Sequence, residues 1–308
     1  MKLTKSESQL IFSMVFLAVV SFFYVRGVHQ EIAKGELLDQ EITRYEESIR
    51  PFLDIAVNAE GFAIFDADKG EFVYKRNAEA PMPLASLAKI MSAIVIMENT
   101  PEDHVFTISK EALSVLGDNK LLVDERWGRD ELLKFTLVES SNDAVYEMAS
   151  EVGSLIDPNT ADPRAVFVSK MNDKARELKL RSLEFNNESG LDMTTEVSGA
   201  YGSARDVTKL FAYALEKFPE VFAPTTKSSP VFNSLDASHT AKNTNPIVES
   251  INGITASKTG FTNISGGNLS VAIKASNGEN LVMTVLGSTF DDRFTDISTL
   301  SEVVNKSN

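Results

Sequence analysis

Three short polar motifs, far apart in the chain, most constrain what this sequence can fold into. They are Ser86-Leu87-Ala88-Lys89, Ser140-Ser141-Asn142 and Lys258-Thr259-Gly260. Each motif is short enough to occur by chance, so each alone would carry little weight. Together they supply a hydroxyl nucleophile, lysines and supporting polar groups, the components of a serine acyl-transfer site. We therefore expect a fold that brings the three segments to one cleft.

The first motif opens a segment, Ser86 to Met97, that is apolar on almost every side. Such a segment predicts a helix buried inside a domain, with Ser86 at its N-terminus and Lys89 one turn later on the same face. Backbone N–H groups at a helix N-terminus favour developing negative charge. A lysine walled in by apolar side chains can lose its charge and take the proton of a serine hydroxyl. Ser86 and Lys89 are therefore the predicted nucleophile and general base.

The second motif falls between two helical patterns, Glu131–Val138 and Ala144–Val152. We expect Ser140 to Asp143 to form the loop between these helices, because flanking helices can hold such a loop with Ser140 and Asn142 aimed into a cleft. An ordinary helix N-cap is the alternative interpretation, since serine and asparagine are preferred there.

The third motif occurs once and is followed by strand patterns. On an edge strand, Lys258 would present a positive charge and Thr259 a hydroxyl, while Gly260 would let a substrate backbone approach closely. Such a strand could hold a substrate that ends in a free carboxylate. An ordinary polar strand end is the alternative for the triplet taken alone.

Strand patterns lie at both ends of the region after residue 59. Phe62–Phe65 and Phe72–Tyr74 flank a turn-rich stretch, and Leu269–Ile273 and Leu281–Leu286 flank Asn277-Gly278, a strong hairpin signal. Helical patterns occupy the chain between these ends. We therefore expect strands from both ends of the chain and helices between them.

The sequence resembles the serine-type D-alanyl-D-alanine carboxypeptidases, the low-mass penicillin-binding proteins, over most of residues 61–298. The order of the three motifs is the signature set of penicillin-binding proteins and active-site-serine β-lactamases. Longer matching phrases are Ser141-Asn142-Asp143-Ala144, Phe185-Asn186-Asn187-Glu188-Ser189-Gly190-Leu191-Asp192, Ser203-Ala204-Arg205-Asp206, Asn243-Thr244-Asn245 and Lys258-Thr259-Gly260-Phe261-Thr262. Ser141, Glu188 and Ala256 stand where Gly, Pro and Gly are usual, and none of these departures removes a group that does chemistry.

The resemblance implies an α/β (α+β), β-lactamase/transpeptidase-like fold: a five-stranded antiparallel sheet flanked by helices, with an inserted, mostly helical region. It implies that Ser86 forms an acyl-enzyme with Lys89 as general base, and that Ser140 relays a proton to the leaving D-alanine. The implied substrate-binding residues are Asn142, Lys258, Thr259, Gly260 and Phe261. Backbone N–H groups of Ser86 and Phe261 would form the oxyanion hole.

The implied substrate is a peptidoglycan stem peptide ending in D-Ala-D-Ala, and the implied covalent inhibitors are β-lactam antibiotics. No metal or organic cofactor is needed. A D,D-endopeptidase that cuts cross-links would use the same residues. A β-lactamase of class A would need a further glutamate for deacylation, and the chain has no convincing Glu-x-x-Leu-Asn motif. A catalytically silent protein that binds cell-wall peptide is the remaining alternative, although Ser86, Lys89 and Lys258 are all present.

The N-terminus carries a membrane signal. Lys2 and Lys5 precede Leu10–Val25, a run without charged residues. Because no Ala-x-Ala site follows, we expect an uncleaved anchor over residues 1–28, with a cleaved signal peptide as the alternative. A charged linker or stalk, 29–58, and a peptidase domain, 59–308, would follow. The protein would then be a single-pass membrane protein with its catalytic domain on the extracytoplasmic side, or secreted or periplasmic after cleavage.

Composition limits the other classes of function. The formal net charge of -14 argues against a nucleic-acid partner, because such proteins normally present a basic face to phosphates. The absence of cysteine excludes disulfides, thiolate metal sites and cysteine nucleophiles. His29, His104 and His239 are isolated in the sequence and have no metal-ligand spacing. No metal site is therefore expected.

Overall fold

The computed structural model describes two stretches continuously, 55–117 and 120–306, and these further positions: 14, 21, 26–27, 30–32, 34–35, 37–40, 42–43, 46 and 50–53. The chain divides into two units, Met1–Leu53 and Asp54–Asn308. Every described residue of the first unit is helical. The predicted anchor, 1–28, lies outside the described residues except at positions 14, 21, 26 and 27. Among the residues that the structure describes, no helix is long and apolar enough to span a bilayer.

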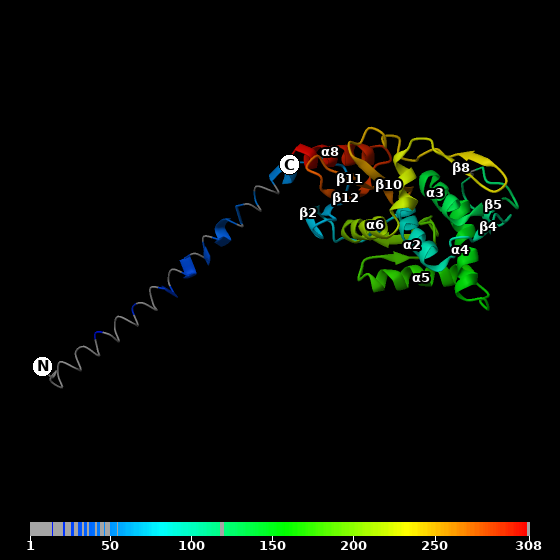
Figure 1. The fold of residues 1–308 in the computed structure, drawn as a ribbon, viewed down its shortest axis with the longest axis horizontal. Helices are drawn as coiled ribbons and strands as arrows, with labels where there is room; N and C mark the ends of the chain where they lie inside the picture. The colour runs from blue at the N-terminus through cyan, green and yellow to red at the C-terminus, as the bar shows by residue number, and fades with distance from the viewer. Residues whose placement is uncertain are drawn as a thin grey trace. The chain divides into compact units, whose positions relative to one another are not determined.

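The second unit contains a five-stranded antiparallel sheet with the strand order β10-β11-β12-β1-β2, and most of the helical region lies to one side of it (Figure 1). Its strands are β1 (Gly61–Asp66), β2 (Glu71–Arg76), β10 (Ile254–Thr262), β11 (Gly266–Lys274) and β12 (Asn280–Ser288). β1 pairs with β12, with Ala63 opposite Thr284, so the two ends of this unit share one sheet. The predicted fold class is therefore confirmed.

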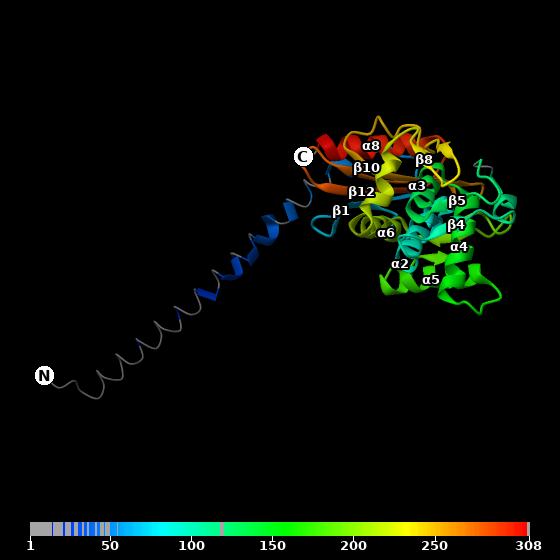
Figure 2. The ribbon, with the colours of Figure 1, turned by 45° about the vertical axis from the view of Figure 1, so that its right-hand side comes forward.

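Helices cover both faces of this sheet. α8 (Asp292–Lys306) packs on β11 and β12, whereas α6 (Ala204–Lys217) packs on β1 and β12 from the other side (Figure 2). All six residues of β1 are buried as a result. A strand buried on both faces contributes about 1.5–3 kcal/mol for each large apolar side chain that it removes from water.

The helical region lies between β2 and β10 in the chain. Its longer helices are α2 (Lys89–Asn99), α3 (Arg129–Glu139), α4 (Asn142–Ile156) and α5 (Pro163–Glu177). The short helices are α7 (Pro219–Phe222), η1 (Ala85–Ala88), η2 (Ala112–Ser114) and η3 (Ala223–Thr226). The small strands are β3 (Met82–Pro83), β4 (Val105–Thr107), β5 (Arg126–Gly128), β6 (Glu184–Phe185), β7 (Ala200–Gly202), β8 (Val231–Asn233) and β9 (Ser238–Thr240).

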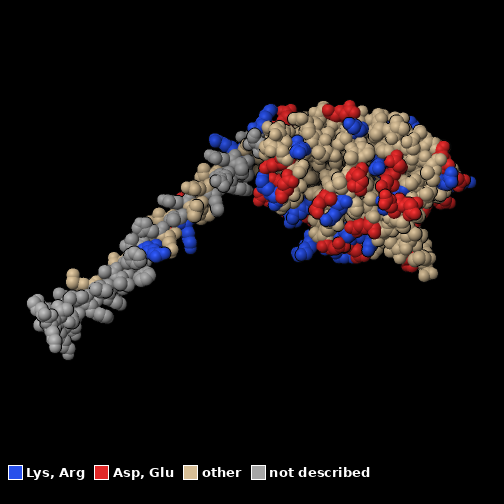
Figure 3. All heavy atoms as spheres, viewed as in Figure 1, with Lys and Arg blue, Asp and Glu red and all other residues tan. Residues whose placement is uncertain are grey.

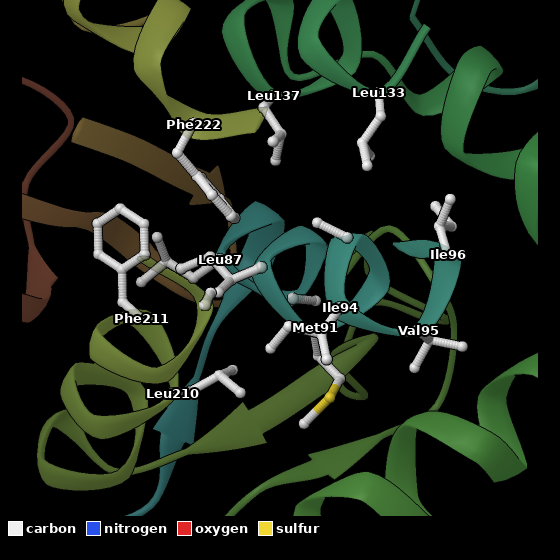
Figure 4. Packing of buried hydrophobic residues seen from close by; sticks show 14 of the residues in the cluster. Leu87, Met91, Ile94, Val95, Ile96, Leu133, Leu137, Leu210, Phe211 and Phe222 are labelled. Atoms are coloured by element: carbon white, nitrogen blue, oxygen red, sulfur yellow. The ribbon is translucent and has the colours of Figure 1, made fainter. Parts of the chain in front are cut away.

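α2 lies in the middle of the hydrophobic core, as its apolar sequence predicts. Figure 4 shows its side chains among residues of α3, α6 and α7; the labelled residues are Leu87, Met91, Ile94, Val95, Ile96, Leu133, Leu137, Leu210, Phe211 and Phe222. Packing on several sides leaves α2 little freedom to move. The residues at its N-terminal end are therefore held in fixed positions.

The second unit carries both signs of charge on the face drawn in Figure 3, where basic and acidic side chains lie intermixed. Several of these side chains form ion pairs, such as Lys75 with Glu79 and Arg126 with Asp236. Exposed pairs of this kind contribute at most about 1 kcal/mol each. The buried core described above therefore dominates the stability of this unit.

Candidate active site

The three sequence motifs meet in one place. Ser86 lies in the 3-10 turn that leads into α2, and Lys89 is the first residue of α2. Ser140 directly follows α3 as its C-cap, Asn142 begins α4, and Lys258 lies in β10. Hydrogen bonds join Lys89 to Ser86 and Asn142, and Lys258 to Ser140. The expectation of a common site is therefore met by the geometry.

Lys89 is the centre of the first half of the site. Its buried Nζ donates to Oγ of Ser86 at 2.9 Å, to Oδ1 of Asn142 at 2.8 Å and to the carbonyl of Ser189 at 3.0 Å. An ammonium has three N–H groups, so all three are used. After loss of one proton, two N–H groups can still bind Asn142 and Ser189 while the lone pair faces the Ser86 hydroxyl. This geometry suits a general base.

The environment of Lys89 favours its neutral form. Burial lowers the pKa of Lys89 from 10.5 to about 7, although the negative charges of Glu188 and Asp143 oppose the effect. A base whose pKa lies near neutrality is present in its free form at physiological pH and still accepts a proton readily. The buried lysine can therefore activate the Ser86 hydroxyl.

Lys258 is the centre of the second half of the site. Its Nζ donates to Oγ of Ser140 at 2.8 Å and to the carbonyl of Thr259 at 2.8 Å. Burial, followed by the charges of Lys89 and Arg293, holds the pKa of Lys258 well below 10.5. A carboxylate placed beside this lysine would favour its charged form. The site is therefore better suited to an anionic ligand than to a cation.

Ser140 and Ser141 are the entire link between α3 and α4, which is shorter than the loop predicted for Ser140 to Asp143. Ser141 is the N-cap of α4 and accepts a hydrogen bond from the backbone N–H of Ala144 at 3.1 Å. Its cap extends α4 back to Asn142, which is why the loop is short. The N-cap alternative thus applies to Ser141, whereas Ser140 adopts a left-handed conformation with φ 60°. A left-handed non-glycine residue is uncommon and is often found where function fixes the backbone.

Gly260 lets two protein segments approach each other closely, a role that comes in addition to the one expected from the sequence. A Cβ at this position would lie 2.7 Å from the carbonyl oxygen of Leu84 and 3.3 Å from Cβ of Ala85. The absence of a side chain therefore lets β10 pack against the turn that carries Ser86. β10 is at the edge of the sheet, as predicted.

Thr259 and Phe261 flank this glycine. Oγ1 of Thr259 lies 2.6 Å from Oγ1 of Thr244, so the Asn243-Thr244-Asn245 segment supports the strand from the side. Phe261 is 42% exposed, and its ring meets that of Phe290 edge to face with centroids 4.9 Å apart. The strand therefore presents a hydroxyl on one side of Gly260 and an exposed ring on the other.

Comparison with known proteins decides the family. The sequence pattern of Peptidase S11, D-alanyl-D-alanine carboxypeptidase, matches residues 47–289. The chain belongs to this family. It is 27% identical over 216 residues to the D-alanyl-D-alanine carboxypeptidase DacF of Bacillus subtilis, covering 68% of this chain and 52% of that protein. It is also 27% identical over 209 residues to the D-alanyl-D-alanine endopeptidase of Pseudomonas aeruginosa, covering 66% of this chain and 63% of that protein.

The matches to these curated Peptidase S11 relatives span between half and two thirds of the relatives' length. A solved structure is covered more fully: penicillin-binding protein D2 from Listeria monocytogenes, in its ampicillin-bound form. It superposes with a TM-score of 0.69 at 27% identity, over 82% of this chain and 99% of that one. The resemblance inferred from the sequence motifs is confirmed at the level of family and fold.

Arg293 is a site residue of this Peptidase S11 protein that the sequence did not reveal. Its buried Nη1 donates to the carbonyl of Gly260 at 2.7 Å, and its guanidinium lies over the rings of Phe290 and Phe294 at 4.6 Å. Burial lowers its pKa to about 10, against the opposing charge of Asp291. An arginine in the first turn of the last helix gives no signal in the sequence, because its partner is 33 residues away.

Two histidines of this protein lie in the described part of the chain, and each contacts one carboxylate. Nε2 of His104 lies 2.9 Å from Glu151, and Nε2 of His239 lies 2.6 Å from Glu125. Within the described ranges, no group of three or more His, Cys, Asp or Glu side chains could hold a metal ion.

Proposed function

We propose that this Peptidase S11 protein is a serine D,D-peptidase that removes the terminal D-alanine from peptidoglycan stem peptides through an acyl-enzyme on Ser86. The observation that carries the proposal is the 2.9 Å hydrogen bond between the buried Nζ of Lys89 and Oγ of Ser86. The burial that lowers the pKa of Lys89 to about 7 makes it a base that works at neutral pH.

Acylation begins when Oγ of Ser86 attacks the carbonyl carbon between the two terminal D-alanines and its proton passes to neutral Lys89. The carbonyl oxygen becomes an oxyanion, which the backbone N–H groups of Ser86 and Phe261 stabilise. Collapse of this intermediate breaks the C–N bond. The leaving amine takes its proton from the lysine through the hydroxyl of Ser140.

Deacylation completes the cycle when water attacks the ester carbonyl, releases the shortened peptide and restores the Ser86 hydroxyl. Lys258 and Thr259 bind the terminal carboxylate of the substrate before this sequence begins, and Asn142 binds the amide of the penultimate residue. Burial is the main reason why the pKa of Lys258 is lowered, and a bound carboxylate would counter it by favouring the charged form of this lysine. β-Lactams would acylate the same serine.

Endopeptidase activity on cross-links is the second candidate function. It is supported by the Pseudomonas aeruginosa relative that is named an endopeptidase, with the same identity as the carboxypeptidase relative. β-Lactamase activity is a weaker alternative because of the family match. Silent peptide binding is a weaker alternative because Lys89 is hydrogen-bonded to Ser86.

The deciding experiment compares two substrates with the 59–308 segment and the full chain: a pentapeptide ending in D-Ala-D-Ala and a cross-linked muropeptide dimer. Release of D-alanine from the pentapeptide supports the carboxypeptidase, and cleavage of the dimer supports the endopeptidase. Ser86→Ala should abolish either reaction, whereas Ser154→Ala, an exposed serine of α4, should leave it unchanged. Hydrolysis of penicillin without either peptide reaction would instead favour a β-lactamase.

We also propose that residues 1–28 anchor the protein in the cell membrane with the second unit on the extracytoplasmic side. The support is the charge-free run Leu10–Val25 behind Lys2 and Lys5. N-terminal sequencing of the mature protein tests the proposal. A mature chain that begins near Val28 would mean that the segment is a signal peptide.

A further inference from the structure

Glu188 and Arg164 form an ion pair that joins the loop after β6 to α5. Nη2 of Arg164 donates to both carboxylate oxygens of Glu188, at 2.9 and 3.0 Å. The side chain of Glu188 is 3% exposed and that of Arg164 is 36% exposed. The guanidinium also lies over the ring of Tyr146 of α4, 4.2 Å from its centroid. Burying a carboxylate without a partner costs free energy of folding, and here Arg164 is the partner of the buried carboxylate.

The backbone at Glu188 is fastened to the helix that carries the proposed base. Its carbonyl accepts a hydrogen bond from Oγ of Ser92 at 2.6 Å, and the next carbonyl, that of Ser189, accepts one from Nζ of Lys89 at 3.0 Å. Ser92 and Lys89 are three residues apart on α2, so both donors lie on the same face of the helix. The position of Glu188 therefore determines where the Ser189 carbonyl meets Lys89.

The turn that follows is closed by a side chain. Oδ1 of Asn187 accepts hydrogen bonds from the backbone N–H groups of Ser189 at 3.2 Å and of Gly190 at 2.7 Å. The carbonyl oxygen of Ala85 would lie 1.8 Å from a Cβ at Gly190, so this turn packs directly against the segment that carries Ser86. The loop is therefore fastened to α2 by its carbonyl groups and packed against the Ser86 segment at Gly190. Both contacts fix its position relative to Ser86 and Lys89.

We propose that Glu188 is a positioning residue for proton transfer: its Arg164-bound carboxylate fixes the Ser189 carbonyl against Lys89 and supplies a negative charge that faces this lysine. The inference rests on the proposed function, in which Lys89 takes the proton of Ser86. Arg164 then has a role of its own, because it partly offsets the charge that Glu188 presents.

The direction of the electrostatic effect follows from the charges around Lys89. Glu188 is the largest of the charges that raise the pKa of Lys89, followed by Asp143, against the larger lowering by burial. The charged groups that surround this part of the site are, by element, Asp143 of α4, Arg164 of α5, Glu188 of the loop, Lys258 of β10 and Arg293 of α8. Removing the Glu188 charge should therefore make Lys89 easier to deprotonate, and removing the Arg164 charge should make it harder.

The test measures the second-order rate of acylation by a labelled penicillin as a function of pH. Glu188→Gln keeps the shape of the side chain and should move the acid limb of the profile down by about 1 pH unit. Arg164→Gln should move the limb in the opposite direction, and Arg164→Lys should restore the original midpoint. Arg176→Gln changes an exposed arginine of the same helix and should leave the profile unchanged.

The outcomes separate this inference from the proposed function. If the unaltered protein shows no pH-dependent labelling of Ser86, the proposed function fails. If it is labelled with an acid limb but the Gln variants at 188 and 164 share its midpoint, or shift it in the same direction, only the positioning role of Glu188 is overturned. Thermal unfolding shows whether Glu188→Gln is folded. If it is not, Arg164→Gln still gives the direction of the shift in the acid limb, because Arg164 is partly exposed.

Discussion

Nζ of Lys258 donates a hydrogen bond to Oγ of Ser140 at 2.8 Å, across 118 residues of sequence. This contact joins the second motif to the third, as the bond from Lys89 to Asn142 joins the first motif to the second. Two lysines thus hold three segments of the chain together. Because both lysines are buried and hydrogen-bonded, their positions are fixed before a ligand arrives.

Lys258→Ala should weaken recognition of the substrate carboxylate. A hydrogen bond to a charged group contributes about 1.5–3 kcal/mol, so the second-order rate of acylation should fall by roughly 10- to 150-fold. Lys274→Ala, at an exposed lysine on the neighbouring strand, is the matched control and should have no effect. Equal rates for Lys258→Ala and the control would show that Lys258 does not bind the carboxylate.

Acylation should depend on pH through Lys89. The pKa of this lysine is lowered to about 7, so its neutral form predominates above pH 7 and is lost as the pH falls below it. The rate of penicillin acylation should therefore be half-maximal near pH 7 and fall about tenfold for each further pH unit below. Stopped-flow measurement of the acylation rate between about pH 5 and 9 checks this midpoint. A flat profile would mean that Lys89 is not the base.

Gly260→Ala should disturb both stability and chemistry. Its Cβ would meet the Leu84 carbonyl at 2.7 Å, and a forced shift of this kind costs about 1–3 kcal/mol. Because the shifted segment carries Ser86, acylation should slow as well. Gly278→Ala is the comparison: φ there is 92° and nothing lies within 4 Å, so it should lower stability without slowing acylation. Urea unfolding and penicillin labelling of both variants separate the two effects.

Ile94→Ala should destabilise the second unit by about 2–5 kcal/mol, because the fully buried side chain leaves a cavity in the middle of α2. Leu155→Ala, at a position 46% exposed on α4, should change the free energy of unfolding by less than about 0.5 kcal/mol. Equilibrium denaturation in urea provides both values. Similar losses for the two variants would contradict the central place of α2 in the core.

The sequence predicted the strands of the sheet and the burial of α2 for physical reasons. Strands such as β1 and β12 carry continuous apolar patterns, and α2 is apolar on almost every side, so local composition indicates their burial. Lys89 was conspicuous because it interrupts such a helix. Residues that are neighbours in the sequence are enough to indicate these strands, this buried helix and its lysine.

Other features depend on contacts between distant segments and left no local pattern. The bond from Arg293 to Gly260, the packing of Gly260 against Leu84 and the bond from Lys89 to the Ser189 carbonyl all arise only when the chain is folded. The left-handed conformation of Ser140 is likewise fixed by the junction of α3 and α4. The membrane anchor stays a prediction from the sequence.

The mass of the protein after reaction with a labelled penicillin tests most directly whether Ser86 is the nucleophile. One adduct is expected, located by peptide mapping on Ser86, and no adduct is expected in Ser86→Ala. The matched control Ser154→Ala, at an exposed serine, should be labelled like the unaltered protein. Undiminished labelling of Ser86→Ala, or an adduct on another residue of the unaltered protein, would contradict the assignment of Ser86 as the nucleophile.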